Sequence, residues 1–289
     1  MSKLNYLKHL LWVVCALPLL VMAQANAPVG LVVDLKGPVT ATDQGKNVRI
    51  EVMGYLRPQM EIDVGAGGML AVTLYANSSE SRFNGPAKLK VLADRVQVLQ
   101  GAAAQQRSLN EAPVSAAKRV VSTRLTQAAV MMRSVKPASE GPALVPVSGS
   151  RIMILNPVFS WPVPDTAAGP SRFELRRASG ELLYQGTANG GTLQLPAANT
   201  LEWGQSYRWR VQSETSPSAR VEGRFEVITR EKLMELAERR PPNDGPFADW
   251  VLFAAMLDDL SLTAEATEVW KWLAVQRPDD ENLKRLANR

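Results

Sequence analysis

Short apolar stretches separated by turn residues are the feature that most restricts the fold of this chain. In residues 29–101, turn residues such as glycine, proline and asparagine interrupt the apolar stretches about every 8 to 20 residues. This spacing is typical of antiparallel strands. Within residues 69–75, Leu70, Val72 and Leu74 alternate with the side chains of the opposite face, so we expect them to face the core. The region is therefore predicted to be a β domain.

A second region with the period of strands covers residues 150–229. Its apolar residues recur two positions apart: Phe173 and Leu175, Leu193 and Leu195, Tyr207, Trp209 and Val211, Phe225 and Val227. Arg208 and Arg210 alternate with these apolar positions, as expected of strands that have one face in water. The pattern predicts a second β domain.

The period changes to that of helices in residues 230–289. Thr229 can cap a first helix, and prolines stop both this helix and the third one. Two further helices are predicted over about residues 247–260 and 263–276. The chain is thus expected to be mainly β and multidomain, with an α-helical C-terminal segment.

Residues 1–25 have the pattern of an export signal. Two lysines precede an apolar run of fourteen residues, and small residues follow the run. The run is shorter than the roughly 20 residues that a helix needs to cross a bilayer. This pattern predicts a secretory signal peptide, cleaved after Ala25 or Ala27. The protein is therefore expected to be periplasmic or exported, without a permanent membrane span.

The only histidine, His9, and the only cysteine, Cys15, lie in this leader. The cleaved protein would therefore contain neither residue type. Their loss excludes Ser-His-Asp triads, cysteine nucleophiles, disulfides, and zinc, copper or haem sites built on histidine or cysteine ligands. The sequence predicts no catalytic residue, no cofactor-binding residue and no metal site, and the protein is expected not to be an enzyme.

Residues 102–149 are predicted to form a basic linker. Up to Pro137 this segment has one acidic residue, Glu111, against six basic residues: Arg107, Lys118, Arg119, Arg124, Arg133 and Lys136. Apolar residues at helical spacing predict an amphipathic helix over residues 115–133. Two interpretations remain open: a basic surface for an anionic glycan, a lipid or an acidic protein, or a docked helix with an ordinary solvated side. No aromatic residue alternates with these charges, which disfavours nucleic acid.

The glycine and apolar positions of the first β region follow a known pattern. They include Gly30-Leu-Val-Val33, Gly37-Pro-Val39, the strand around Val72, and Phe83-Asn-Gly-Pro-Ala87. Residues 29–101 resemble FecR-type periplasmic domains on these positions. FecR regulators carry a cytoplasmic segment and a membrane helix ahead of this domain, whereas a signal peptide is expected here. The resemblance therefore does not imply control of a sigma factor.

The later regions resemble two other families. Pro157-Val-Phe-Ser-Trp161 and the turn and strand around Tyr207 resemble fibronectin type III and other immunoglobulin-like sandwiches, in which a tyrosine forms a corner. Trp250, Phe253, Ala254 and Leu257, followed by Ala266, Trp270, Leu273 and Pro278, resemble one tetratricopeptide repeat. We expect these aromatic residues to belong to a core. The order of the domains resembles a group of exported bacterial FecR-domain proteins without assigned activity.

Two short motifs resemble those of enzymes. Ser115–Lys118 spells the S-x-x-K of penicillin-binding proteins, but Tyr75–Asn77 precedes the serine where a second motif should follow, and the Lys-Thr-Gly motif is missing. Gly65–Gly68 lacks the third glycine of a dinucleotide-binding loop, so a hairpin turn explains it better. Neither motif supports an enzyme.

Carboxylates remain as candidates, since glycoside hydrolysis needs only two of them, roughly 5 to 9.5 Å apart. Glu61 and Asp63 would share one face of a strand, and Asp258-Asp259 would end a helix. Each has a simpler explanation as a solvated or turn residue. Residues 279–281 are acidic at the predicted start of the last helix, where negative charge is favourable, so they do not require calcium.

These observations favour a non-enzymatic periplasmic or cell-envelope protein that acts as a protein-interaction, sensory or scaffold module. Another envelope protein is the expected partner. The alternative is a module that binds peptidoglycan or another glycan through the basic linker and exposed aromatic residues such as Trp203. A carboxylate-based glycan hydrolase is a less favoured form of this alternative. Neither nucleic acid nor a cofactor is expected to bind.

Overall fold

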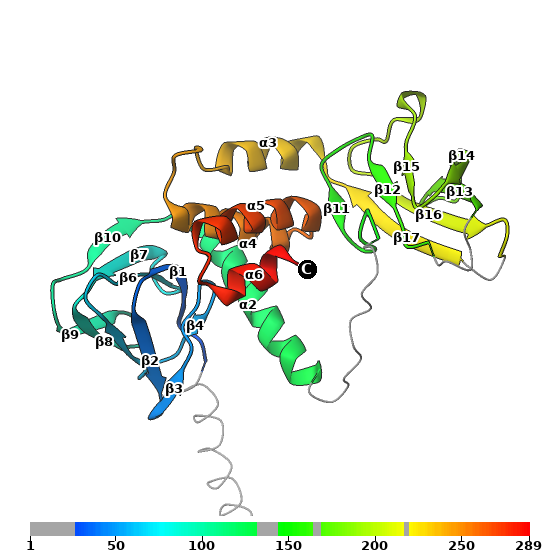
Figure 1. Cartoon of the computed structure of the whole chain (residues 1–289). Coiled ribbons are helices and arrows are strands. Elements are labelled where there is room, and N and C mark those ends of the chain that lie inside the picture. The colour runs from blue at the N-terminus through cyan, green and yellow to red at the C-terminus, as the bar shows by residue number, and fades with distance from the viewer. Residues whose placement is uncertain (1–26, 132–143, 164–168, 217–219) are drawn as a thin grey trace, which may run out of the picture. The chain divides into compact units, whose positions relative to one another are not determined.

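The computed structural model describes residues 27–131, 144–163, 169–216 and 220–289, with the backbone alone for residues 124–131 (Figure 1). The predicted signal peptide lies outside the described residues and stays a prediction. The described part contains four β-sheets, and helices follow them towards the C-terminus. This arrangement confirms the expected mainly-β, multidomain layout.

Contacts within the chain divide it into two compact units. The first unit consists of Met1–Val121 and Arg277–Leu283, and the second of Ser122–Gln276 and Lys284–Arg289. A short segment near the C-terminus therefore belongs to the same unit as the N-terminal strands. Sequence periodicity did not indicate this return of the chain.

Two five-stranded antiparallel sheets form the first unit. One has the order β10-β7-β6-β1-β4, with β1 at Gly30–Lys36, β4 at Tyr55–Leu56, β6 at Met69–Leu74, β7 at Ser79–Asn84 and β10 at Gln105–Ser108. The other has the order β3-β2-β5-β8-β9, with β2 at Val39–Asp43, β3 at Lys46–Val48, β5 at Glu61–Val64, β8 at Ala87–Val91 and β9 at Val96–Gln100. Leu70, Val72 and residues of both sheets share one buried cluster, as expected from the alternation.

The opposite face of the central strands is buried as well, which the alternation did not predict. Ala71 and Thr73 are fully buried, and Asp34 and Glu80 are 3% and 2% exposed. Glu80 accepts hydrogen bonds from Arg82 (3.0 Å) and from Arg107. The buried charges on this face are thus held by arginines of the same unit.

The helix α2, Glu111–Met131, begins four residues before the predicted start of a helix at residue 115. Asn110 explains the early start, because its Oδ1 accepts a hydrogen bond from the N–H of Ala112 at 3.1 Å. Val114, Ala117 and Val121 of α2 are buried. This burial favours a docked helix for the part of the predicted linker that the structure describes; Arg133 and Lys136 lie outside it.

The prediction of a hairpin turn at Gly65–Gly68 is wrong. The strands on either side, β5 and β6, pair with different neighbours and lie in different sheets. The N–H of Gly68 donates to the carbonyl of Gly65 at 2.9 Å, so the turn is tight and carries the chain from one sheet to the other. A Cβ at Gly85 would lie 1.8 Å from the oxygen of Gly65, which explains the glycine there.

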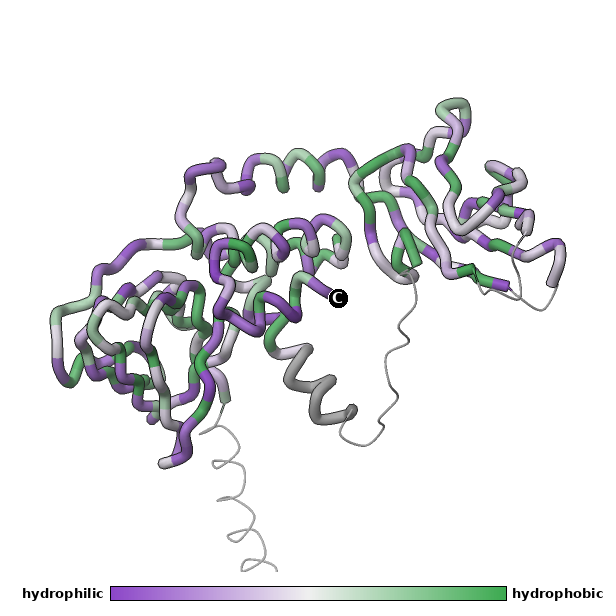
Figure 2. The backbone as a smooth tube through the Cα atoms, in the orientation of Figure 1, coloured by the Kyte–Doolittle hydropathy of each residue, from purple (hydrophilic) through white to green (hydrophobic). Residues whose placement is uncertain are grey.

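The strands of the second unit form a five-stranded sheet, β11-β17-β16-β13-β14, and a two-stranded sheet, β12-β15. Their bounds are Arg151–Ile152 for β11, Val158–Ser160 for β12, Pro170–Arg177 for β13, Leu182–Asn189 for β14, Thr192–Gln194 for β15, Ser206–Ser213 for β16 and Arg220–Val227 for β17. Figure 2 shows that hydrophobic and hydrophilic stretches alternate over short distances along the chain. This alternation is typical of strands with one buried face.

The two sheets of the second unit share an aromatic core. All the apolar residues that recur two positions apart, from Phe173 to Val227, are buried in one cluster. The ring centroids of Phe159 and Phe173 are 4.8 Å apart, and Trp209 packs against both rings. The hydroxyl of Tyr207 accepts a hydrogen bond from the N–H of Glu202 at 2.9 Å. This bond fixes the turn that precedes β16.

The helices α3 (Arg230–Arg239), α4 (Phe247–Asp259), α5 (Thr263–Gln276) and α6 (Glu281–Ala287) confirm the predicted helical segment. Thr229 caps α3, since its Oγ1 accepts the N–H of Lys232 at 3.2 Å. The residues expected in the helical core are buried: Trp250, Phe253, Ala254, Leu257, Ala266, Trp270 and Leu273. Among the described residues, no helix has both the length and the apolar character needed to cross a membrane.

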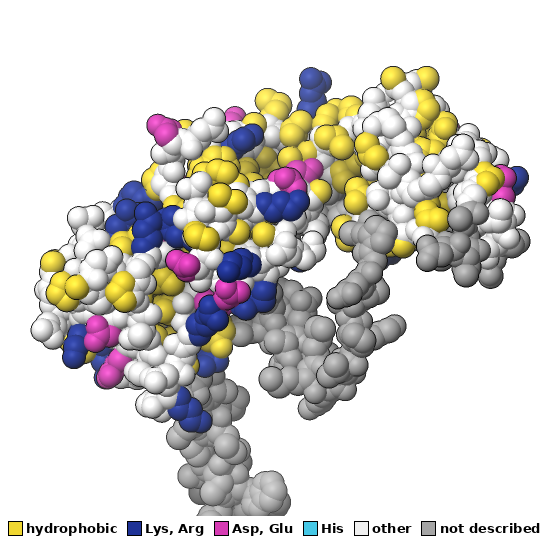
Figure 3. Space-filling model, viewed as in Figure 1, with side chains coloured by type: hydrophobic (Ala, Val, Ile, Leu, Met, Phe, Trp, Pro, Cys, Tyr) yellow, Lys and Arg dark blue, Asp and Glu magenta, His cyan; other side chains and the backbone are white. Residues whose placement is uncertain are grey.

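Apolar side chains also lie on the surface (Figure 3). Met234 and Val275 are 60% and 75% exposed. Exposed apolar residues of this kind are normal on folded proteins. They do not by themselves indicate a binding site.

Glu265 supplies a pH-dependent part of the stability of the second unit. Its Oε1 accepts the N–H of Met153 at 3.3 Å, and its buried Oε2 has no hydrogen-bond partner among the described residues. Burial raises the pKa of Glu265 above its ordinary value, against a smaller lowering by backbone N–H groups. Because the folded chain then binds this proton more tightly than the unfolded chain, the stabilisation is full below the unfolded pKa and is lost as the pH rises through the folded pKa.

We therefore expect Glu265→Gln to flatten the fall in stability above about pH 4.3, the ordinary pKa of glutamate. Urea denaturation of the wild type and the variant across pH 4 to 8 measures this effect. The variant should gain stability relative to the wild type as the pH rises. An equal slope for both proteins would show that Glu265 does not titrate with folding.

Candidate functional site

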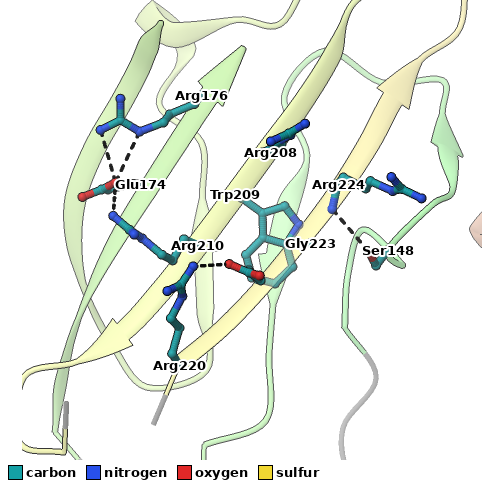
Figure 4. Close-up of a pocket in the computed structure, with 10 residues that line it drawn as sticks. Ser148, Glu174, Arg176, Arg208, Trp209, Arg210, Arg220, Gly223 and Arg224 are labelled. Carbon is teal, nitrogen blue, oxygen red and sulfur yellow. Dashed lines mark hydrogen bonds and ion pairs between the residues drawn. The ribbon is translucent and has the colours of Figure 1, made fainter. Parts of the chain in front are cut away.

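A pocket of about 520 Å³ lies on the outer face of the five-stranded sheet of the second unit. Its lining is rich in arginine and comes from β13, β16, β17 and the segment before β11: Ser148, Glu174, Arg176, Arg208, Trp209, Arg210, Arg220, Glu222, Gly223 and Arg224 (Figure 4). Alternation places these arginines outward, because the residues between them, such as Trp209 and Phe225, fill the core.

The register of the three strands aligns the charges in rows. Arg176, Arg208 and Arg224 lie opposite one another across the sheet. The next row is Glu174, Arg210 and Glu222, and the third is Arg172, Gln212 and Arg220. We call the surface formed by Arg172, Arg176, Arg208, Arg210, Arg220 and Arg224 the arginine face. With two glutamates against six arginines, its formal charge is 6 − 2 = +4.

Glu174 holds two of these arginines. It accepts a hydrogen bond from Arg210 at 2.7 Å and weaker ones from Arg176 at 3.4 Å. Burial raises the pKa of Glu174, but the hydrogen bond and charge of Arg210, followed by those of Arg176, outweigh it and hold the pKa below its ordinary value. Glu222 in turn forms an ion pair with Arg220. Three arginines of the face thus contact a glutamate, and two of these share the single charge of Glu174.

Arg208 and Arg224 differ from these three. They are exposed, directly opposite each other on β16 and β17, and neither guanidinium group has an acidic partner among the described residues. Figure 4 shows the hydrogen bonds that converge on Glu174, and no dashed line reaches the guanidinium of Arg208. Like charges directly opposite each other are unfavourable in a sheet. We call these two residues the arginine pair.

A second pocket, of about 600 Å³, also includes the arginine pair. Ser150 and Ser206 contribute to its lining, together with Glu226, which pairs with Arg151, and Asp259. Beside the pair, the N–H of Arg224 donates to Oγ of the exposed Ser148 at 3.4 Å. The arrangement therefore brings unneutralised positive charge and hydroxyl groups together, and such a set of donors can bind an anion.

The carboxylates that the sequence suggested as candidates for glycoside hydrolysis have other contacts in the structure. Glu61 and Asp63 share an exposed face of β5, opposite Lys90 and Lys88 of β8. Asp258 accepts a hydrogen bond from Nε1 of Trp270 at 3.0 Å. No group of three His, Cys, Asp or Glu residues able to hold a metal ion occurs in the part of the chain that the structure describes.

Three other candidates from the sequence do not line either pocket. Trp203 is half-buried and packs against the aromatic core, so the expectation that it is exposed is wrong. Asp280 caps α6, since its Oδ1 accepts the N–H of Leu283 at 2.9 Å, as favoured for an acidic residue at a helix start. Ser115 and Lys118 lie on α2, and Lys118 Nζ is 5.2 Å from the ring centroid of Tyr75.

The sequence predicted only part of the arginine face, namely the outward positions of Arg208 and Arg210. The signal that could have found the rest is a repeated motif. Residues 172–176 and 220–224 both read Arg-x-Glu-x-Arg, on either side of Arg208-Trp-Arg210 in the folded sheet. Such repeats predict rows of charge only when the strand register is known.

Comparison of the chain with protein-family models and with curated proteins finds no match. The resemblances to FecR-type, fibronectin type III and tetratricopeptide domains therefore stay predictions.

Proposed function

We propose that the protein is an exported cell-envelope protein that acts by binding rather than by catalysis, as an interaction or scaffold module. The arginine face is its binding surface, and the partner presents negative charge. The single observation that supports this proposal most strongly is the arginine pair, with Arg208 and Arg224 side by side and without acidic partners among the described residues. Unneutralised cations next to each other are stabilised when an anion binds between them.

The proposal includes the predicted domain types. The hydrogen bond from the Glu202 N–H to the Tyr207 hydroxyl supports a tyrosine corner, and hence a fibronectin type III-like sandwich. Sandwiches of this type serve many functions, so the fold itself does not name the partner. The signal peptide expected in residues 1–25 supports the envelope location.

Arginine suits such a surface better than lysine. Its planar guanidinium group donates two parallel hydrogen bonds to a carboxylate or phosphate, and it is less strongly hydrated than an ammonium group. Arginine is also enriched in protein interfaces. The arginine face has no lysine in its three rows of charge, which fits recognition of an anion rather than solubility alone.

A glycan is the second candidate for the partner. The hydroxyl-bearing Ser148 beside Arg224 favours it, because hydroxyl groups and arginines together suit acidic sugars. The half-buried position of Trp203 removes the exposed aromatic platform on which a neutral glycan would stack. If the partner is a glycan, we therefore expect an acidic glycan and not a neutral one.

The double variant Arg208→Gln with Arg224→Gln tests the proposal. We expect it to bind poly-L-glutamate at least about tenfold more weakly than the wild type at low salt, since charge-assisted hydrogen bonds are the strong ones. The matched control, Lys46→Gln with Lys88→Gln, removes two exposed charges from the first unit and should leave binding within about twofold. Interferometry with immobilised poly-L-glutamate, and sedimentation with purified peptidoglycan, provide the two readouts.

Two outcomes would contradict the proposal. One is equal loss of binding in both double variants, which would mean that overall charge and not the arginine face attracts anions. The other is a lack of binding to both probes by the wild type at low salt. Release of sugar fragments in the sedimentation assay would instead overturn the non-enzymatic part of the proposal.

A further inference from the structure

Three arginines of the arginine face have no acidic partner among the described residues. Arg176 and Arg210 contact Glu174, and Arg220 contacts Glu222, so Arg172, Arg208 and Arg224 remain. Arg172 stands apart from the other two, opposite Gln212 in the third row. In these three rows, Arg208 and Arg224 are therefore the two arginines that lie opposite each other and both lack an acidic partner.

The arginine pair can converge on a single group. Residues directly opposite in antiparallel strands have Cα atoms about 4.5 to 5.5 Å apart, so two long side chains reach a common point above the sheet. Each guanidinium group has five N–H donors in a fixed planar arrangement. Two such groups offer more donors than one carboxylate, with its two oxygens and single charge, can use.

The neighbouring row limits the size of the ligand. Glu174, Arg210 and Glu222 lie about 6.8 Å along the strands from the pair and have a formal charge of −1. A long polyanion that followed the strands would meet these glutamates. A compact group with high charge density fits beside them better than an extended chain of single charges.

Hydroxyl groups complete the site. Oγ of Ser148 accepts the N–H of Arg224, so its own proton remains available to a ligand oxygen. Ser206 is exposed and lines the second pocket, which the arginine pair shares, and the Glu226 carboxylate opposite it is paired with Arg151. These donors are suited to an oxyanion with more than two oxygens.

From this geometry we propose that the arginine pair is a phosphate-binding site. A phosphate group presents three acceptor oxygens and up to two negative charges, which match two guanidinium groups and a hydroxyl. This inference rests on the proposed function and names the group that the arginine face recognises. The phosphate belongs to an anionic phospholipid headgroup or to a free phosphate or soluble phosphate ester.

Calorimetric titration of the purified protein with inorganic phosphate, and with acetate at equal ionic strength, tests the inference. We expect phosphate to bind at least about tenfold more tightly than acetate, and Arg208→Gln or Arg224→Gln to weaken phosphate binding by at least about tenfold. The matched control Arg230→Gln removes an exposed arginine of the same unit outside the arginine face and should change binding less than about threefold. Arg208→Lys with Arg224→Lys keeps the charge but removes the planar donors, and should reduce the preference for phosphate over acetate.

Vesicles distinguish the two sources of phosphate. Binding to phosphatidylglycerol vesicles, but not to pure phosphatidylcholine, that is lost in Arg208→Gln supports a lipid headgroup. Binding of inorganic phosphate without vesicle binding supports a free phosphate or a soluble ester.

Equal affinity for acetate and phosphate, or an equal loss of binding in Arg230→Gln, would overturn the phosphate site. If poly-L-glutamate binds through the arginine pair while phosphate does not, this inference fails and the proposed function stands. If neither probe binds at low salt, both fail. Circular dichroism of each variant confirms that the sheet is still folded.

Discussion

Replacing Arg277 with alanine is expected to lower the free energy of unfolding of the first unit by about 3 to 5 kcal/mol, the usual cost of removing one partner from a buried ion pair. Nε of Arg277 donates to Oδ1 of Asp34 at 2.9 Å, and Nη2 donates to Oδ2 at 3.1 Å. The side chains are 13% and 4% exposed, so the Asp34 carboxylate would remain buried without this partner. Hydrogen exchange of the β1 and β6 amides, measured by mass spectrometry, reports the stability of this unit separately.

Two comparisons separate a lost ion pair from a general effect of losing an arginine. Arg95→Ala removes an arginine that is 67% exposed and paired with the exposed Asp94, and should cost less than about 1 kcal/mol. Asp34→Leu combined with Arg277→Met replaces the pair by apolar groups and should recover most of the lost stability. Equal protection of the β1 amides in Arg277→Ala and the wild type would show that the C-terminal segment does not stabilise the first unit.

Side chains that follow Arg277 also form hydrogen bonds with the backbone of the first unit. Asp280 Oδ2 accepts the N–H of Val52 at 2.7 Å, and Asn282 Nδ2 donates to the carbonyl of Val52 at 2.7 Å. Burial raises the pKa of Asp280 above its ordinary value, although the N–H groups of Val52 and Leu283 lower it in part. The C-terminal segment thus holds the turn at Val52 through side-chain hydrogen bonds from Asp280 and Asn282.

Periodicity predicted the elements of this fold well, because it reflects local burial. Thr229 as a helix cap, the helices over 247–260 and 263–276, and the inward positions of Phe173 and Leu175 all follow from neighbours within a few residues. The burial of both faces of β1 and β6 could not be predicted in this way. At Asp34 of β1 it depends on Arg277, which is distant in sequence, and alternation contains no information about such a contact.

The candidate site depended on strand register, which single-sequence patterns do not determine. The outward direction of Arg208 was predictable, but its position opposite Arg224 and Arg176 requires the pairing of β13, β16 and β17. A shift of one residue in that pairing would place the arginines against other residues and turn a strand to the wrong face. The sequence therefore contained the charges, and only the fold brought them together.

Replacing Trp209 with alanine is expected to destabilise the second unit by about 3 to 5 kcal/mol, as for other large buried aromatic residues. Trp209 is 1% exposed and lies between Phe159, Phe173 and Trp161, with centroid distances of 5.7, 6.2 and 6.3 Å. Gly223 is opposite Trp209 and has no side chain to fill the resulting cavity. Differential scanning calorimetry measures the loss as a lower melting temperature of the second unit.

Two variants show whether ring volume explains this loss. Trp209→Phe keeps most of the ring and removes Nε1, a buried donor without a partner among the described residues, so it should cost much less than alanine. Trp272→Ala removes a tryptophan of the same unit that is 39% exposed, and its cost should also be smaller. Because Trp209 lies between Arg208 and Arg210 on β16, its loss should also weaken anion binding at the arginine face. If Trp209→Ala melts at the same temperature as the wild type, the aromatic core does not hold the two sheets together. Trp209 would then not stabilise the strand that carries Arg208.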